Sequence, residues 1–137
     1  MSSFRLTPIG RVRSTLRHRT SAPKQGREGA PDARLEIFPD FAAGLNGIAP
    51  GAEIIVLTWL HEAERQTLEV HPRDDESRPL TGVFATRSAD RPNPVGLHRV
   101  TVLNVDRSGW LAVTSLEAID GTPVIDLKPV LDQNVES

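Results

Sequence analysis

Residues 95–116 read V-G-L-H-R-V-T-V-L-N-V-D-R-S-G-W-L-A-V-T-S-L, and this stretch decides the fold class. Over residues 95–105 the apolar side chains follow a period of two, so that Val100 and Val102 share one face of an extended segment. The following D-R-S-G is a hairpin connection, and residues 110–116 supply the next strand. The stretch therefore predicts two neighbouring antiparallel β-strands.

The same pattern extends along the rest of the chain. Eleven prolines and ten glycines leave little room for a long helix, and β-branched alternation recurs between them. Short strands at regular intervals favour a barrel or a sandwich, so we expect an all-β protein. Further strands are expected at residues 5–14, 35–38, 53–61, 68–70, 81–86 and 124–127, and a helical turn at residues 41–45.

Two of these strands carry more specific expectations. In residues 5–14, Arg11 and Arg13 share the face opposite the apolar side. Residues 53–61 contain I-I-V-L-T-W-L, which is apolar on both faces, and this predicts the most buried strand. Residues 68–70 are expected to continue the same sheet.

Length and composition point to one small soluble domain. The chain has 137 residues without a visible repeat or linker, so a single domain over residues 1–137 is expected. No run approaches the roughly 18 apolar residues that cross a bilayer, and the N-terminus shows no secretory signal. The absence of cysteine excludes disulfides, thiolate zinc sites and a cysteine nucleophile. We expect a cytoplasmic protein with no membrane partner.

Charge is distributed unevenly along the chain. Residues 1–34 carry 8 basic and 2 acidic side chains, a net charge of +6 within a chain whose net charge is -2. A basic patch attracts phosphates locally even when the whole protein is acidic. The alternative is a solvated arginine-rich strand, followed by a mobile surface loop at residues 21–32.

The polar segment at residues 82–97, G-V-F-A-T-R-S-A-D-R-P-N-P-V-G-L, is a candidate recognition loop. Pro92 and Pro94 fix the backbone, so the loop loses little entropy on binding. Arg87 offers a planar fork for a carboxylate or phosphate, and Asn93 offers a donor and an acceptor for an adenine edge. The alternative is a well-made turn with two surface arginines.

A second polar segment spans residues 116–129, L-E-A-I-D-G-T-P-V-I-D-L-K-P. Asp120-Gly121 predicts a turn, and Asp126 and Lys128 place opposite charges on one face of an extended segment. Taken alone, such a segment is more often a solvated hairpin than a binding site.

Other kinds of site find little support. His61, Glu62, Glu64 and His71 lie close in sequence, but no HExxH motif occurs and an extended segment turns the two glutamates away from His61. No metal site is therefore expected. GxSxG, GxGxxG and GxxxxGK[ST] are also absent, which argues against an esterase-type nucleophile and a phosphate cradle.

Together, GVFATRSADRPNPVGLHRV and LEAIDGTPVIDLKP resemble the signature of the TrmO (YaeB/VirR) family of tRNA methyltransferases. That family carries GVFATRS-x-x-RPNP-[IV]-G and DGTPV-x-D-[IL]-KP. IGRVRS at residues 9–14 and PKQ at residues 23–25 resemble its opening IG-x-[IV]-RS and its PRQ loop. Longer members also have an aromatic-rich central strand and a C-terminal region, so the resemblance is to a short form.

The resemblance implies a small antiparallel six- or seven-stranded β-barrel that binds S-adenosylmethionine and works as a homodimer. It also implies a tRNA partner and methylation of N6 of N6-threonylcarbamoyladenosine beside the anticodon. The cofactor positions that it suggests are Gln25, Gly26, Arg27, His61, Glu62, Arg87, Leu97, Thr114, Ser115, Leu116 and Glu117.

Residue chemistry assigns roles within this family framework. Glu117 suits the sulfonium cation, Arg87 the amino-acid head and Leu97 the apolar wall of a cofactor site. Our candidate general base is Asp120. Further candidates are Arg91, Asn93 and Lys128 for the substrate, and Arg11 and Arg13 for tRNA phosphates.

Two alternatives stay open. A module that binds S-adenosylmethionine without catalysis, such as a regulator with a different substrate, would retain the cofactor positions. A purely structural barrel would retain none of them.

Overall fold

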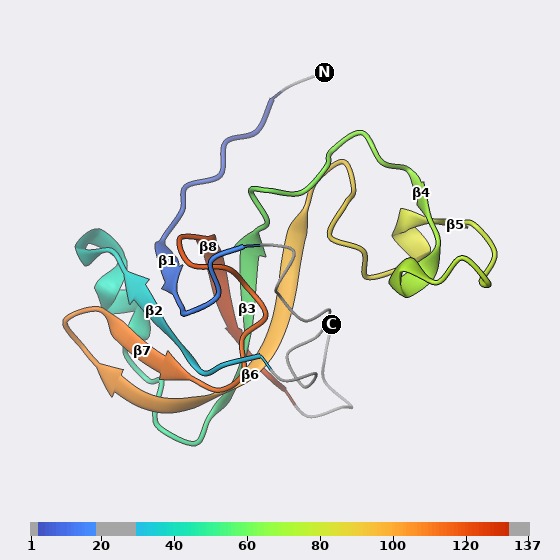
Figure 1. Cartoon of the computed structure of the whole chain (residues 1–137). Coiled ribbons are helices and arrows are strands. Elements are labelled where there is room, and N and C mark those ends of the chain that lie inside the picture. The colour runs from blue at the N-terminus through green and yellow to red at the C-terminus, as the bar shows by residue number, and fades with distance from the viewer. Residues whose placement is uncertain (1–2, 19–29, 132–137) are drawn as a thin grey trace.

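The computed structural model describes residues 3–18 and 30–131, in which six strands form an antiparallel sheet that closes on itself (Figure 1). The strand order around this closed barrel is β1, β2, β7, β6, β3 and β8, and β8 pairs with β1. The bounds are β1 Gly10–Arg13, β2 Ala33–Ile37, β3 Glu53–Trp59, β6 Val95–Asp106, β7 Trp110–Val113 and β8 Pro123–Pro129. The expected all-β antiparallel barrel is confirmed, with six strands in this part of the chain.

The barrel has an apolar interior because alternate residues of each strand point inward. Val12 of β1 lies opposite Leu35 of β2, which in turn lies opposite Leu111 of β7. All three side chains are fully buried. Burial of a valine or leucine side chain is worth about 1.5–3 kcal/mol, so this inner layer supplies much of the driving force for closure.

β6 is the longest strand and changes partner along its length. Its first half, residues 95–101, pairs with β3, and residues 102–106 pair with β7. A register shift between Val102 and Asn104 lies at the start of the β7 pairing. Such irregularities bend a strand and increase its twist, which helps a small sheet to close.

Two expected turns are confirmed. Gly109, at the end of the D-R-S-G connection, has a φ of 136°, and an added Cβ would lie 2.6 Å from the carbonyl oxygen of Ile37. Gly121 in the Asp120-Gly121 turn has a φ of 86°. Both positions therefore favour glycine on backbone grounds.

Three strands of the barrel are shorter than expected, and one of them is β3, which ends at Trp59 and not at residue 61. β1 begins at Gly10, and residues 3–8 before it are exposed and form no strand. The expectation of a strand from residue 5 is therefore wrong. β7 ends at Val113 rather than at residue 116. There, Ser115 N–H donates to Asp32 Oδ1 and Leu116 N–H donates to the carbonyl oxygen of Pro31, so neither extends the ladder with β6.

β3 is buried on one face, not on both. Ile54, Val56 and Thr58 are buried, whereas the alternate side chains of Ile55, Leu57 and Trp59 are only partly covered. The expected burial of both faces is wrong because a closed barrel encloses only the inward-facing residues of each strand.

Residues 60–94, which we call the arm, leave the barrel between β3 and β6 (Figure 1). In the arm, β4 Glu69–Val70 pairs with β5 Thr81–Gly82 in a separate two-stranded sheet. The expectation that residues 68–70 continue the main sheet is therefore wrong. Its remaining elements are two short 3-10 helices, η4 Pro72–Asp74 and η5 Val83–Ala85.

The strand expected at residues 81–86 is also corrected, since β5 ends at Gly82 and η5 follows. An arginine is the physical reason: Nη2 of Arg91 donates to the carbonyl oxygens of Val83 and Thr86 and so holds the backbone in a turn. The 3-10 helix η3 Pro39–Leu45 confirms the helical turn expected at residues 41–45. In the described ranges, no helix has the length and apolar character needed to span a membrane.

Candidate functional site

The barrel is closed, but its ladder of backbone hydrogen bonds is interrupted between the first half of β6 and the segment that follows β7. Two hydrogen bonds between Thr101 and Thr114 end the β6–β7 contact: Thr114 N–H donates to Thr101 O at 3.0 Å, and Thr101 N–H donates to Thr114 Oγ1 at 2.9 Å. Within the described residues, no backbone hydrogen bond joins residues 95–100 to residues 115–119. We call the boundary between these two segments the seam.

Predicted cofactor residues lie on both sides of the seam. Leu97 is on β6 and is 46% exposed on the outer face of the barrel. On the other side, Asp32 and Pro31 accept the backbone N–H groups of Ser115 and Leu116, each at 3.0 Å, and hold that segment near the start of β2. The predicted residues at the seam are Leu97, Thr114, Ser115, Leu116 and Glu117.

A buried histidine connects the two sides. His98 points into the barrel and is 6% exposed, with Nε2 2.8 Å from Thr58 Oγ1 of β3. Its Nδ1 lies 3.5 Å from Glu117 Oε1, which is long for a hydrogen bond. Within the described part of the chain, His98 Nδ1 and Glu117 Oε2 are buried without a hydrogen-bond partner. The seam therefore holds a carboxylate and an imidazole whose bonding capacity is only partly used.

Sequence reasoning missed His98 and Thr58. A usable signal was present, because His98 has the same parity as the inward-facing Val100 and Val102. A histidine at an inward position of a buried strand needs a polar partner. The partner, Thr58, comes from a strand pairing that spacing along the sequence does not reveal.

The proline-containing loop at the base of the arm is tied to the end of β3. Leu60 N–H donates to Pro94 O at 2.8 Å, and Arg91 N–H donates to Glu64 O at 3.1 Å. Arg65 donates to Pro92 O at 2.7 Å and to Asn93 Oδ1 at 3.1 Å. The loop is therefore fixed to residues 60–65, the first part of the arm after β3.

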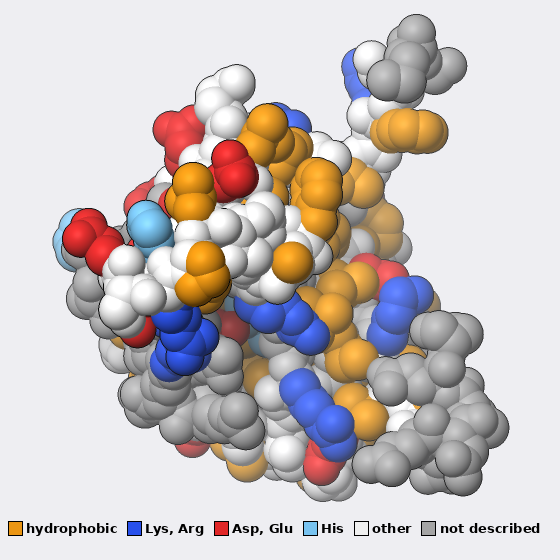
Figure 2. Space-filling model, turned by 90° about the vertical axis from the view of Figure 1, so that its right-hand side faces the viewer, with side chains coloured by type: hydrophobic (Ala, Val, Ile, Leu, Met, Phe, Trp, Pro, Cys, Tyr) orange, Lys and Arg blue, Asp and Glu red, His pale blue; other side chains and the backbone are white. Residues whose placement is uncertain are grey.

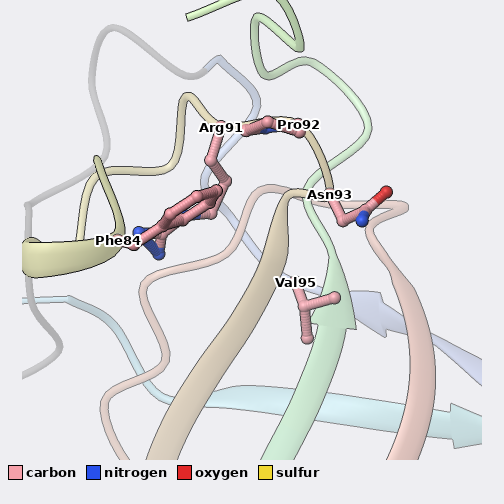
Figure 3. Close-up of a pocket in the computed structure, with 5 residues that line it drawn as sticks. All are labelled: Phe84, Arg91, Pro92, Asn93 and Val95. Atoms are coloured by element: carbon pink, nitrogen blue, oxygen red, sulfur yellow. The ribbon is translucent and has the colours of Figure 1, made fainter. Parts of the chain in front are cut away.

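An open pocket of about 340 Å³ lies beside this loop (Figure 3). Its lining residues are Phe84, Arg91, Pro92, Asn93 and Val95. Phe84 is 83% exposed, and in Figure 3 its ring lies beside the Arg91 side chain, across the pocket from Asn93 and Val95. An exposed aromatic ring, an amide and an arginine at one pocket suit a flat polar ligand such as a nucleobase.

The pocket gives Arg91 and Asn93 a shared location. Arg91 also has a structural task, because its Nη2 atom is bound to the two carbonyl oxygens of the η5 turn. The Asn93 side-chain atom that faces Arg65 must be the oxygen, since a guanidinium only donates. The Asn93 amide nitrogen is then the atom left to donate to a ligand.

Asp120 lies directly after residues 115–119, in the turn before β8, and its carboxylate is fully engaged. One carboxylate oxygen accepts the backbone N–H of Ser14 at 3.0 Å, and the other accepts from Arg17 Nη1 at 3.0 Å. Arg13 Nη1 lies 3.8 Å from the same carboxylate. A proton acceptor at this position would have to act from within this network.

Arg11 and Arg13 both contact Glu36 on the outer face of β1 and β2. The Nε atom of each lies 3.1 Å from Glu36 Oε1. The hydrogen bond from Arg11, followed by that from Arg13, lowers the pKa of Glu36 below its ordinary value, although burial opposes this shift. The two arginines predicted to contact tRNA therefore lie side by side, each paired with Glu36.

The remaining predicted residues are dispersed. His61 and Glu62 are exposed in the turn after β3, and Arg87 is exposed on the arm. Lys128 Nζ lies 3.3 Å from Asp126 Oδ2 on β8. Gln25, Gly26 and Arg27, with most of the loop expected at residues 21–32, lie outside the described residues.

Across residues 3–18 and 30–131, no group of three or more His, Cys, Asp or Glu side chains is arranged as a metal site. Figure 2 shows the side of the molecule from which the arm extends, where hydrophobic side chains lie among several Lys and Arg side chains. On the arm, Leu68, Leu80 and Phe84 are the large apolar side chains exposed by more than half.

Comparison with known proteins gives one consistent family. Residues 11–134 match the model of the family described as tRNA-methyltransferase O N-terminal domain. A "Probable S-adenosyl-L-methionine-binding protein" of Methanothermobacter thermautotrophicus is 45% identical over 126 residues, which is 92% of this chain and 89% of the relative. An "S-adenosyl-L-methionine-binding protein" of Archaeoglobus fulgidus is 45% identical over 124 residues, covering 90% of this chain and 86% of the relative.

Solved structures agree. A crystal structure of TrmO from Pseudomonas aeruginosa aligns with a TM-score of 0.76 at 28% identity, over 99% of this chain. The aligned part is 60% of that TrmO chain, so this chain spans less than two thirds of it. The fold and the family match over nearly the whole length of this chain therefore agree: it belongs to the tRNA-methyltransferase O N-terminal domain family.

Proposed function

We propose that this protein is an S-adenosylmethionine-dependent tRNA methyltransferase that modifies N6 of N6-threonylcarbamoyladenosine next to the anticodon. The observation that carries the proposal is the contact across the seam. His98, next to Leu97 of the first motif segment, lies 3.5 Å from Glu117 of the second. The family, and two relatives named as S-adenosyl-L-methionine-binding proteins, support the same assignment.

The residues at the seam fit the cofactor chemically. S-adenosylmethionine supplies an electrophilic methyl group on a positively charged sulfur. Glu117 offers a carboxylate for that charge, with one buried oxygen lacking a hydrogen-bond partner in the described residues. Leu97 offers exposed apolar surface. Arg87, which is exposed on the arm and not at the seam, is the proposed cation for the carboxylate of the amino-acid head. Further proposed contacts are Gln25, Gly26, Arg27, His61, Glu62, Thr114, Ser115 and Leu116.

The pocket beside the arm loop is the proposed site for the acceptor base. Phe84 would stack on the flat ring, which is a frequent way of holding an unstacked base. The Asn93 amide nitrogen would donate to a ring nitrogen of adenine. Arg91 lines the same pocket, and it and Lys128 are proposed to attract the carboxylate or phosphates of the substrate.

The acceptor nitrogen gains a methyl group and loses its proton, so the site needs a proton acceptor. Our proposed base is Asp120, which is ion-paired with Arg17 and bound to the backbone of Ser14. Asp120 follows Glu117 by three residues, so the two acidic groups lie on one segment of the chain. General bases contribute about 10²–10⁴-fold to the rates of such reactions.

The wider setting is also part of the proposal. Arg11 and Arg13 would contact tRNA phosphates, and a homodimer would cover the exposed apolar side chains near the site. A tRNA-modifying reaction belongs in the cytoplasm.

One observation favours a second candidate function. Both carboxylate oxygens of Asp120 are already engaged, and a module that binds S-adenosylmethionine without catalysis needs no base. This alternative retains the seam as a cofactor site but predicts no chemical product.

Mass spectrometry of tRNA nucleosides distinguishes the two functions. Deletion of the gene should abolish methylated N6-threonylcarbamoyladenosine, and the wild-type gene should restore it while a Glu117→Gln gene restores less. Unchanged nucleosides, combined with calorimetric binding of S-adenosylmethionine, would favour the non-catalytic module. Unchanged nucleosides without binding would refute both.

A further inference from the structure

His98 occupies a space that the barrel keeps open for it. It lies on β6 opposite Val56, and its Nε2 atom is 2.8 Å from Thr58 Oγ1. The neighbouring inward position is Gly96, where an added Cβ would lie 2.3 Å from Thr58 Oγ1 and 2.7 Å from His98 Nε2. The threonine and the histidine can therefore meet only because residue 96 lacks a side chain.

The other ring nitrogen faces the seam. Nδ1 of His98 lies 3.5 Å from Glu117 Oε1, and its hydrogen-bonding capacity is unused in the described residues, as is that of Glu117 Oε2. Buried polar atoms are normally paired because an unpaired one loses its bonds to water. The imidazole and the carboxylate that carry these two atoms approach to 3.5 Å, which indicates a place where a bound group or a small closure completes the arrangement.

Few polar side chains of the described residues are buried. The buried polar or charged side chains of the described residues are Thr58, His98 and Thr122. Thr58 of β3 contacts the ring of His98 and does not titrate. Glu117, from the segment after β7, is the titratable group that the described structure brings into contact with the ring. The charge of this pair therefore depends on His98 and Glu117 together.

The charge of the pair matters for the proposed ligand. S-adenosylmethionine carries a positive sulfur, and S-adenosylhomocysteine, its product after methyl transfer, carries a neutral one. A neutral imidazole leaves the Glu117 carboxylate its full negative charge, whereas a protonated imidazole cancels it. Only the neutral form of His98 lets Glu117 distinguish the two molecules by charge.

We propose that His98 is a positioning residue that holds the Glu117 carboxylate toward the sulfonium and so sets the preference for the charged methyl donor over its neutral product. This inference rests on the proposed cofactor site at the seam. Thr58 orients the ring by bonding Nε2, which leaves Nδ1 to donate to Glu117. His98 acts through Glu117 and does not touch the reacting atoms.

The test is a ratio of two dissociation constants, measured by calorimetry for S-adenosylmethionine and S-adenosylhomocysteine between pH 8 and pH 5.5. Both molecules share the adenosine and the amino-acid head, so contributions from groups that contact those parts cancel in the ratio. Histidine is the side chain that ordinarily changes charge in this range. The wild-type protein should prefer S-adenosylmethionine by about tenfold at pH 8, with a preference that declines at low pH.

Substitution locates the effect. His98→Asn should reduce the preference to about threefold or less and remove its pH dependence, since the amide stays neutral and holds Glu117 less well. His71→Asn is the matched control, because His71 lies on the arm and contacts Arg78 O, away from the seam. It should retain the wild-type profile.

Each result supports or overturns the inference. A wild-type ratio that does not vary with pH, or a folded His98→Asn protein with the wild-type profile, overturns this inference and leaves the cofactor site intact. Failure of the wild-type protein to bind either molecule overturns the proposed function together with it. If His98→Asn does not fold, the wild-type pH profile alone decides.

Discussion

The carboxylate of Asp120 accepts a hydrogen bond from the backbone N–H of Ser14 at 3.0 Å. This bond joins the turn before β8 to the residue that follows β1, although the two positions are 106 residues apart in sequence. The segment that follows the seam therefore has a structural anchor at its far end. The same carboxylate is our proposed base, so its two roles need to be separated by experiment.

Asp120→Asn should separate them. The amide can still accept the Ser14 N–H, but it cannot take a proton, so turnover on tRNA should fall by about 100-fold. Affinity for S-adenosylmethionine should stay within about threefold of wild type. Arg17→Gln is the control, because it removes the closer of the two ion pairs of Asp120 and leaves the carboxylate. Full turnover in Asp120→Asn would exclude the base assignment.

Phe84→Ala tests the pocket for the acceptor base. The ring is 83% exposed, so its removal should hardly change thermal stability. Loss of base stacking, worth about 1–3 kcal/mol, should raise KM for tRNA by about tenfold, with cofactor affinity unchanged. Leu80→Ala is a matched control, since Leu80 is another exposed apolar residue of the arm. Equal effects of the two substitutions on KM would count against a specific base site.

Gly96→Ala tests the packing that brings Thr58 and His98 together. A Cβ at residue 96 would lie 2.3 Å from Thr58 Oγ1, so overpacking should lower the free energy of unfolding by about 1–3 kcal/mol. At Gly44, an added Cβ meets nothing within 4 Å, and Gly44→Ala should leave stability nearly unchanged. Urea denaturation measures both. Similar stabilities for the two variants would show that the barrel adapts at residue 96.

The Glu36 carboxylate should make part of the stability depend on pH. Hydrogen bonds from Arg11 and Arg13 lower its pKa in the folded protein. This contribution is complete above the ordinary value of 4.5 and is lost as the pH falls through the lowered folded-state pKa. The Tm difference between wild type and Glu36→Gln should therefore be largest near pH 6 and shrink toward pH 3. A difference that is constant over this range would show that the carboxylate charge is not involved.

Strand periodicity predicted the architecture well. The alternation around Val100 and Val102 predicted β6 and its inner face, and the D-R-S-G connection predicted the turn into β7. Both signals are local, since side-chain parity and turn chemistry depend on neighbouring residues. The arm was missed because residues 68–70 have the composition of a strand, and only tertiary pairing decides which sheet a strand joins.

Sequence signals pointed to only some of the residues that meet at the seam. Leu97 and Glu117 were identified through family motifs, and the structure places their segments on the two sides of the seam. His98 lies within the first of the two stretches that resemble the family signature but received no role there, and Thr58 lies in neither stretch. Their contact depends on the β3–β6 register and on Gly96, which are properties of the folded barrel.

The central claim is that two polar segments on either side of the seam hold S-adenosylmethionine through Glu117. Calorimetric titration of S-adenosylmethionine into wild type, Glu117→Gln and Glu53→Gln tests it most directly, because Glu53 is an exposed glutamate of β3, which forms neither side of the seam. The account predicts saturable binding to wild type and Glu53→Gln, and binding about tenfold weaker to Glu117→Gln. Absence of binding to wild type, or equal affinity in all three proteins, would contradict it.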